Sequence, residues 1–473
     1  MARAGWLATI VLCTLLPFVG QFYGDRGAGW LAIDFRAYYC AALAQREHRN
    51  PYFAQSIHDC ERTTPAPFYR VPENVSVPAP YPPYALAFMY PITLLPFAAA
   101  VYLWWALLAA SLLIAAAALA RAAAAPALVA WGALALSLGL TSLTSGNVIP
   151  LAVAAIVVAA LLAQRGKLAA ASLALAFAMI EPQIALPASV GFFALAPRGR
   201  PYLIATFAAL LLVALATAGF AQTLGYGTLV LPAHALSEVS RDNQYSLSTV
   251  LAALGVSDRA AVTAGCVSYI VALVAGVVLA LRLARQYDDP ALAVLVPPAV
   301  SLLGGTFVHT GEIAIAAPAC LVLLMRAAPQ RAWLLGTLIL LAVPWMLSTS
   351  AALFLAPIFP AAYLAYALRH RDRRMALAVA LGAFAVIFGL FELAIGGGHA
   401  SHIVREHPPI DPRLAEAGWR QLVLGNTTNS LVMWLLRLPT WIGLIAFAAL
   451  AAAVARGSAA HPSPDRRLLE SRA

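Results

Sequence analysis

Asp34 is the carboxylate whose place in the sequence most directly suggests chemistry. It stands in the segment Ala32-Ile-Asp-Phe-Arg-Ala-Tyr-Tyr-Cys, shortly after an apolar stretch at 5–22. A carboxylate in this place could take a proton from a hydroxyl, and a general base typically contributes about 10²–10⁴-fold in rate. Asp34 also begins a predicted helix, where a carboxylate often acts as an N-cap. One carboxylate can do both.

His309 and two carboxylates, Glu181 and Glu312, could take part in proton or phosphate chemistry. His309 lies in Thr306-Phe-Val-His-Thr-Gly-Glu312. Histidine can act as a neutral donor or as a cation toward phosphate, although a structural role at a turn is the alternative. Glu181 precedes Pro182 inside an apolar hairpin. A carboxylate in such a place is costly and tends to be functional or paired, and the proline break should line a cavity rather than face lipid.

Amide and guanidinium groups in the same parts of the chain suit the binding of polar ligands. Asn243 and Gln244 carry amides that both donate and accept, as sugar hydroxyls require. Alternatively, this polar turn caps a short helix at 246–254. Arg36 could fork onto phosphate oxygens, although an exposed interfacial arginine often contacts lipid headgroups.

The cysteines predict one disulfide at most. Cys40 and Cys60 share one polar stretch and could pair in an oxidising compartment. Closing a loop of about 20 residues would stabilise the fold by roughly 3 kcal/mol. Cys13, Cys266 and Cys320 lie in apolar stretches and are expected to act as small apolar residues. No cysteine or histidine spacing matches a zinc site, and we expect neither a metal nor another cofactor.

The elements that must position these side chains are apolar helices. Of 473 residues, 62% are hydrophobic and 11% are charged, against roughly 25% charged in soluble domains. Long apolar stretches recur along the whole chain, which predicts an all-α polytopic membrane protein. A secreted enzyme, a cytosolic dehydrogenase and a nucleic-acid-binding domain are excluded. The formal charge of +10 then reflects arginines that anchor loops.

Fourteen apolar stretches are candidates to cross a bilayer, which takes about 20 residues per crossing. They are 5–22, 97–120, 127–143, 148–163, 168–180, 183–197, 201–220, 261–283, 290–306, 312–326, 332–349, 352–368, 375–395 and 431–455. Several are short, especially the two around Pro182, so we expect twelve to fourteen spans in one membrane domain over residues 1–473. The first is expected to be a retained anchor, because no small-x-small cleavage site closes it.

Three polar stretches interrupt the apolar pattern: the first polar loop (24–96), the middle polar loop (222–258) and the last polar loop (396–430). Most of the 30 Lys and Arg residues lie instead in the short turns and tails of the other side. This bias predicts that both termini are cytoplasmic and that the three loops lie outside. The alanine- and arginine-rich composition suggests a bacterium with a GC-rich genome, and the expected location is its inner membrane.

Two short helices are expected in the first polar loop. Residues 34–47 place apolar groups at helical spacing, which predicts an amphipathic helix at the membrane interface. The prolines of Tyr81-Pro82-Pro83 should form a rigid turn into a second short interfacial helix.

These residues together resemble glycosyltransferase family 87, within the GT-C superfamily. The shared pattern is an early aspartate, a tyrosine- and alanine-rich helix, an Asn/Asp-Pro-Tyr turn, and Tyr-Pro-Pro leading to a Leu-Leu-Pro helix. In this chain the pattern is carried by Asp34, Tyr38, Tyr39, Ala42, Pro51-Tyr52, Tyr81-Pro82-Pro83 and Leu95-Pro96.

Three later segments extend the resemblance, which covers roughly residues 1–330 by order and spacing. Ser145-Gly146-Asn147 is similar to a Gly-Gln-x-Asn-type segment, Asn243-Gln244-Tyr245-Ser246 to an Asn-Gln-Ser-like motif, and His309 to a histidine at the outer end of a later span. The chain departs from the family at Glu181-Pro182, where Lys-Pro is common, and in lacking the glutamine expected beside Gly146.

The resemblance implies a membrane glycosyltransferase that moves a hexose, commonly mannose, from a polyprenyl-phosphate sugar to a lipid or glycan acceptor on the outer face. The reaction would be inverting and metal-independent, with Asp34 as the general base and with His309 contacting the acceptor or the leaving phosphate. The residues expected to bind donor or acceptor are Arg36, Tyr38, Tyr81, Asn147, Glu181, Asn243, Gln244 and Glu312.

A transporter or flippase of lipid-linked sugars is the alternative from another functional class. It predicts substrate residues near the membrane midplane and often an inverted repeat, and we find no convincing repeat in the sequence. An inactive scaffold on the same fold is a third possibility. Nothing in the sequence demands more than a monomer.

Overall fold

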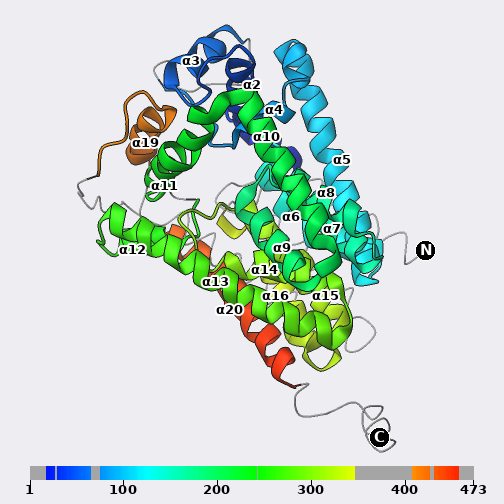
Figure 1. Ribbon diagram of the computed structural model, residues 1–473. Helices are drawn as coiled ribbons and strands as arrows, with labels where there is room; N and C mark the ends of the chain where they lie inside the picture. The colour runs from blue at the N-terminus through cyan, green and yellow to red at the C-terminus, as the bar shows by residue number, and fades with distance from the viewer. Residues whose placement is uncertain are drawn as a thin grey trace, which may run out of the picture.

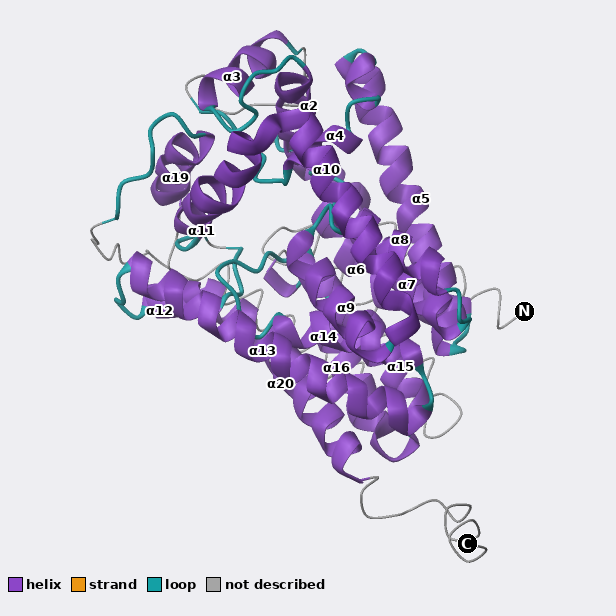
Figure 2. Ribbon diagram, viewed as in Figure 1, coloured by secondary structure: helices purple, strands orange, loops and turns teal. Residues whose placement is uncertain are grey.

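The computed structural model of the protein describes residues 18–26, 29–64, 75–241, 243–346, 407–426 and 431–457. This described part is built of helices and loops without a strand (Figure 2). The prediction of an all-α polytopic membrane protein is confirmed. The expected spans at 352–368 and 375–395, and most of that at 5–22, lie outside the described residues.

Four helical runs in the described residues are long and apolar enough to cross a membrane. They are α5 (Phe97–Ala123), α13 (Asp258–Tyr287), the part Met433–Arg456 of α20 (Leu431–Gly457), and a run from Pro197 to Glu238. A bent pair would add a fifth span: η4 (Glu312–Ile315) with α15 (Ala316–Arg326) meets η5 (Ala328–Gln330) with α16 (Arg331–Ala342) at 116°.

Shorter apolar helices occupy five more of the expected spans. They are α6 (Ala127–Ser142), α7 (Ile149–Gln164), α8 (Leu168–Ala178), α9 (Pro182–Leu195) and α14 (Pro290–Ser301). Each lies within the expected range to a few residues, but none is as long as the roughly 20 residues of a full crossing. Twelve to fourteen spans would therefore have to include these short helices as well as residues outside the described part.

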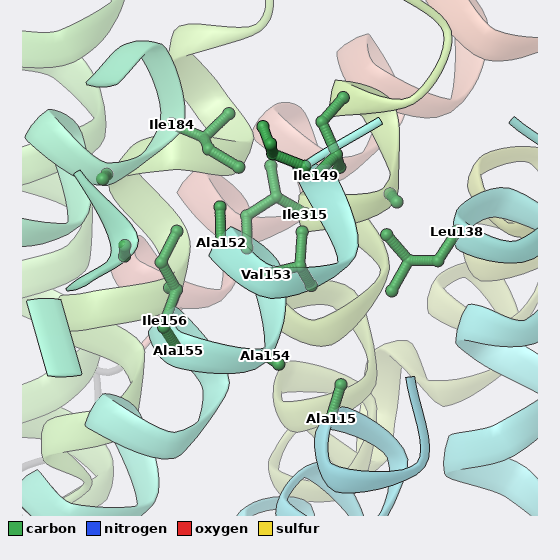
Figure 3. Packing of buried hydrophobic residues seen from close by; sticks show 14 of the residues in the cluster. Ala115, Leu138, Ile149, Ala152, Val153, Ala154, Ala155, Ile156, Ile184 and Ile315 are labelled. Atoms are coloured by element: carbon green, nitrogen blue, oxygen red, sulfur yellow. The ribbon is translucent and has the colours of Figure 1, made fainter. Parts of the chain in front are cut away.

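Helix α7 lies at the centre of the packed core. Twelve of its 16 residues are buried, and it contacts α5, α8, α9 and α14. Figure 3 shows Val153 and Ile156 of this helix among Ile184 of α9, Ile315 of η4 and Leu138 of α6. The alanines between these larger residues let neighbouring helices approach closely. The N-terminus of α7 is thereby fixed, and it follows directly after the Ser145-Gly146-Asn147 turn.

The longest helical run changes direction at Gly219. Helix α10 (Arg200–Gly225) follows the 3₁₀ turn η2 (Pro197–Gly199) and contains Gly219 at φ 77° and ψ 169°, outside the helical region. The run continues through the π turn η3 (Tyr226–Val230) into α11 (Leu231–Glu238). The expected span at 201–220 thus ends at the kink, and α11 is free to turn toward the polar loops (Figure 1).

Helices from all three polar loops lie together. The first loop forms α2 (Ile33–Arg46), α3 (Ala54–Thr63), α4 (Pro83–Phe88) and η1 (Ile92–Leu94), the middle loop forms η3, α11 and α12 (Leu247–Ala253), and the last loop forms α19 (Ala415–Asn426). Helix α19 packs against both α3 and α11 (Figure 1). Three segments far apart in the sequence therefore form one assembly.

Helix α2 is buried within the protein, so the prediction that it lies at the membrane interface is wrong. Its bounds agree with the expected 34–47 to within one residue, but only Asp34, Leu43 and Arg46 are partly exposed and the rest of the helix is buried. Helices α3, α4 and α10 pack around it. Cys40 and Cys60, the pair expected from their shared loop, form a disulfide that joins α2 to α3. Remote segments cover the face that would otherwise meet water.

Candidate functional site

Asp34 is held by Asn147, which lies in the turn between α6 and α7. The side-chain oxygen Oδ1 of Asn147 accepts the backbone N–H of Ile149 (3.1 Å), so its Nδ2 group is directed at Oδ2 of Asp34 (3.0 Å). Asp34 is the second residue of α2, whose N-cap is Ala32 with no side-chain cap bond. The interpretation of Asp34 as an N-cap is therefore wrong, and its carboxylate is partly exposed beside Asn147.

Gly146 allows this turn to press against α2. Its φ of +77° is a left-handed conformation that favours glycine, and a Cβ at this position would lie 2.7 Å from Cβ of Phe35. The carbonyl of Gly146 accepts the indole N–H of Trp104 (2.7 Å), and the carbonyl of Ser145 accepts the backbone N–H of Asp34 (2.9 Å). The segment Ser145-Gly146-Asn147 thus sets the position of the Asp34 backbone and side chain together.

A chain of hydroxyl groups links α2 to Glu181. Tyr81 donates its O–H to Oε2 of Glu181 (3.2 Å) and lies 3.1 Å from the Tyr38 hydroxyl. Because a phenol carries one hydrogen, Tyr38 is the donor to Tyr81. Burial and then the charge of Asp34 raise the pKa of Tyr38 well above its ordinary value, so this phenol stays neutral. Three of the expected binding residues, Tyr38, Tyr81 and Glu181, therefore form one network near Asp34.

His309 lies between two carboxylates in the loop after α14. Its Nε2 is 3.2 Å from Oε2 of Glu238, and its Nδ1 is 3.4 Å from Oε1 of Glu312. Burial alone would lower the pKa of His309, but hydrogen bonds to the carboxylates of Glu238 and Glu312 outweigh this effect and raise it. Both ring nitrogens face acceptors, which suits the doubly protonated imidazolium.

Glu238 is a site residue that the sequence reasoning missed. It is 0% exposed, and its two oxygens accept from Arg241 (3.1 and 3.2 Å), Gln244 (2.8 Å) and the Trp419 indole (2.9 Å) in addition to facing His309. The available signal was the spacing of His234 and Glu238, which puts both on one face of a helix. No local pattern points to Trp419, which is 181 residues away from Glu238.

The amides of the middle polar loop stand beside the His309 loop. Gln244 is 0% exposed, and it donates to Glu238 and accepts the backbone N–H of Val308 (2.7 Å). The backbone carbonyl of Asn243 accepts the hydroxyl of Thr310 (3.4 Å). In this structure Gln244 therefore braces the site with both ends of its amide. The expected short helix is also present as α12, and Ser246 caps it by accepting the Thr249 N–H (3.2 Å).

Arg36 is buried, whereas the lipid alternative requires an exposed arginine. Its side chain is buried within the first polar loop, on α2. An arginine that contacts lipid headgroups must reach the interface, so that alternative does not fit this structure. Its expected role as a phosphate contact stays a prediction.

The Asp34 half and the His309 half of the site meet at the segment before α9. The charges of Glu312 and His309 both act on Glu181, which receives the Tyr81 hydroxyl from the other half. Two residues on, the Gln183 side chain donates to the carbonyl of Phe307 in the His309 loop. The Glu181-Pro182 break therefore lies between the two halves.

One group of side chains in the described residues has the composition of a metal site. Ligand atoms of His234, Glu238 and His309 all lie within 4.8 Å of one another. Two histidines and a glutamate can bind zinc. Here, however, the guanidinium of Arg241 already supplies the cation beside Glu238, and both carboxylate oxygens are engaged. The arrangement fits an imidazolium held between carboxylates better than a bound metal ion.

A comparison with known families fits this arrangement. The model of glycosyltransferase family 87 matches residues 80–308. The chain is similar to this family over just under half of its length. The match agrees with the resemblance seen in the sequence, and it points to a membrane glycosyltransferase. No curated protein and no solved structure matches the chain.

The family 87 region includes part of the candidate site. Tyr81, Asn147 and Glu181 lie inside the match, as do Glu238 and the amides at 243–244. Asp34 and Tyr38 precede it, whereas His309 and Glu312 follow directly after its end. The contacts described above join these flanking residues to the matched region.

Proposed function

We propose that the protein transfers a hexose, with mannose as the first candidate, from a polyprenyl-phosphate sugar to a lipid or glycan acceptor. One observation carries the proposal: Asp34 is a partly exposed carboxylate on a buried helix, oriented by Asn147 at 3.0 Å. A general base has to reach the proton that it removes, and its geometry is decisive. Asp34 combines access to ligand with a fixed orientation.

In the proposed step, a carboxylate oxygen of Asp34 takes the proton of the acceptor hydroxyl while the hydroxyl oxygen attacks the anomeric carbon. The bond between the anomeric carbon and the phosphate oxygen breaks, and polyprenyl phosphate leaves with that electron pair. A single displacement inverts the anomeric configuration. The proton passes from Asp34 to solvent after the product leaves.

His309 is proposed to contact the leaving phosphate or the acceptor. An imidazolium that faces Glu238 and Glu312 is a cation with fixed orientation. Because both of its N–H groups face these carboxylates, it would stabilise charge that develops on a leaving phosphate through its own positive charge. Tyr38, Tyr81 and Glu181 lie on the Asp34 side and Asn243 lies on the His309 side, so these residues are the proposed sugar contacts. Arg36 is retained as a proposed phosphate contact.

The proposed orientation places the site on the outer face of the bacterial inner membrane, with both termini cytoplasmic and the protein active as a monomer. The two ends of helix α7 support this orientation, because they adjoin groups expected on opposite sides of the membrane. Asn147 precedes its N-terminus, whereas Gln164 at its C-terminus donates to Asp289, which pairs with Arg326 at 3.0 Å. Arg326 lies at the short turn between the apolar stretches 312–326 and 332–349, one of the turns expected to be cytoplasmic. The 16-residue helix α7 separates this end from the Asp34 end by roughly 24 Å.

A test of the proposal uses the purified protein in lipid vesicles with host lipids and glycans as acceptors. Labelled polyprenyl-phosphate mannose and a mannose nucleotide are supplied in separate reactions. The proposal predicts transfer from the lipid-linked donor alone and a product whose anomeric configuration, determined by NMR, is opposite to that of the donor. Transfer from the nucleotide, or retention of configuration, would overturn it.

A further inference from the structure

Trp419 places the last polar loop in contact with the site. It lies in α19 and is 5% exposed, and its indole N–H donates to Oε1 of Glu238 at 2.9 Å. The guanidinium of Arg241 sits over the Trp419 ring, 5.2 Å from its centroid. The indole is therefore fixed both through its N–H and through its ring face.

The carboxylate that Trp419 contacts is shared with His309. Oε1 of Glu238 accepts the indole, while Oε2 lies 3.2 Å from Nε2 of His309 and accepts the amide of Gln244 (2.8 Å). A carboxylate that is held at one oxygen cannot rotate without moving the other. Together with Arg241, which donates to both oxygens (3.2 and 3.1 Å), the indole therefore restrains the orientation in which Oε2 meets His309.

Helix α19 is itself anchored to the first polar loop. The backbone N–H of Ala415 donates to the carbonyl of Tyr52 (3.1 Å), and that of Ala54 donates to the carbonyl of Arg413 (2.8 Å). The Tyr52 hydroxyl donates to the carbonyl of Tyr81 (2.8 Å). Trp419 is thus carried by a helix whose neighbours belong to the Asp34 half of the site.

We propose that Trp419 is a positioning residue that holds Glu238 against His309, so that the last polar loop orients His309 in the site. Trp419 lies outside residues 80–308, the part matched by the family model. A role of Trp419 in catalysis rests on the proposed function. The contact between Trp419, Glu238 and His309 can nevertheless be tested without any transfer reaction.

The charges around His309 determine whether its pKa should rise or fall when the Trp419 N–H is removed. His309 faces two carboxylates, Glu238 from α11 and Glu312 from η4. A third carboxylate, Glu181 before α9, also interacts with its charge. The other titratable or cationic groups of this cluster are His234 and Arg241, which both lie near Glu238. If Trp419 holds Glu238 in place, removal of its N–H lets the carboxylate turn away, and the pKa of His309 falls. If the indole only withdrew charge from Glu238, the pKa of His309 would rise.

The experiment follows the ring nitrogens of ¹⁵N-histidine by NMR in lipid nanodiscs as the pH is raised. Wild type is compared with Trp419→Phe, which keeps the ring but removes the N–H, and His309→Gln identifies the His309 signals. Trp441→Phe is the matched control, because Trp441 donates its indole N–H to the carbonyl of Tyr245 (3.1 Å) instead. We expect the His309 midpoint to fall by about one pH unit in Trp419→Phe and to stay unchanged in Trp441→Phe.

A second measurement needs no variant of the positioning residue. In ¹⁵N-tryptophan-labelled wild type, the indole signal of Trp419 should shift with the same midpoint as His309, because both contact one carboxylate. A His309 midpoint that is unchanged or raised in Trp419→Phe, or an indole signal that is insensitive to that midpoint, would overturn the proposal. If these results hold while transfer is absent, the contact is real and the proposed function is what fails.

Discussion

Asn147 and Asp34 are 113 residues apart in the sequence, yet the amide Nδ2 of Asn147 donates to Oδ2 of Asp34 at 3.0 Å. The other end of the amide is occupied by the backbone N–H of Ile149, so the side chain cannot flip without losing a bond. The proposed general base is therefore oriented by the start of the central helix of the core.

Asn147→Ala should lower kcat roughly 10- to 100-fold and leave KM nearly unchanged. A hydrogen bond to a charged group contributes about 1.5–3 kcal/mol, and about 1.4 kcal/mol corresponds to a tenfold change in rate. Steady-state sugar transfer measures this. The control is Asn50→Ala, which removes an asparagine bond to the Tyr52 backbone N–H and should retain kcat. Equal losses in both variants would show that Asn147 does not orient the base.

Gly146→Ala should destabilise the fold more than Gly166→Ala does. Both glycines have positive φ, +77° and +67°, but an added Cβ meets Phe35 at Gly146 and open space at Gly166. Left-handed strain alone costs about 1–2 kcal/mol, and overpacking adds roughly 1–3 kcal/mol. Thermal unfolding in detergent distinguishes the two contributions. Indistinguishable midpoints for the two variants would mean that the turn does not press on α2 as described.

Loss of the Cys40–Cys60 disulfide should lower the free energy of unfolding by roughly 3 kcal/mol, since it closes a loop of about 20 residues. The measurement is thermal unfolding of wild type with and without a reductant. The Cys40→Ser/Cys60→Ser double variant is the control and should be as unstable as reduced wild type, with no further response to reductant. A reductant effect that persists in the double variant would place the sensitive bond elsewhere.

Glu416 should make stability fall as the pH rises through neutrality. Burial raises the pKa of this carboxyl from its usual range to about 8 in the folded state. Between the unfolded pKa and 8 the folded protein holds a proton that the unfolded chain has released, so stability falls by up to about 1.4 kcal/mol per pH unit. Glu416→Gln should remove this dependence.

Unfolding midpoints of wild type and Glu416→Gln at pH 5 and pH 8 check this sign. We expect the variant to gain on wild type at pH 8, where the buried carboxylate loses its proton. The same difference between the two proteins at both pH values would show that Glu416 does not titrate in this window.

Hydrophobic pattern was enough to predict the apolar helices, but not the polar-loop helices α3, α11 and α19. The predicted range 34–47 agrees with α2 to within one residue, and the apolar runs 97–120 and 261–283 agree with α5 and α13 to within four residues at each end. The surroundings of α2 could not be predicted in the same way. Its periodicity describes one helix, whereas its burial depends on α3, α4 and α10, which reach it from other parts of the chain.

The candidate site was predictable at those positions where a polar residue stands at the end of an apolar stretch. Asp34, Asn147, Glu181 and His309 stand out as polar residues at the ends of apolar stretches, and the structure places them in two linked networks. Glu238 did not stand out, because a carboxylate at the end of a short polar helix is common. Its importance comes from donors on three separate segments, which only the folded chain brings together.

Sugar transfer by Asp34→Asn tests most directly whether the carboxylate of Asp34 removes the proton of the acceptor. Wild type, Asp34→Asn and Asp59→Asn are compared at equal expression with labelled polyprenyl-phosphate mannose; Asp59 is an exposed carboxylate on α3. We predict a loss of about 10²-fold or more in Asp34→Asn and full activity in Asp59→Asn. Equal transfer by wild type and Asp34→Asn would contradict the account.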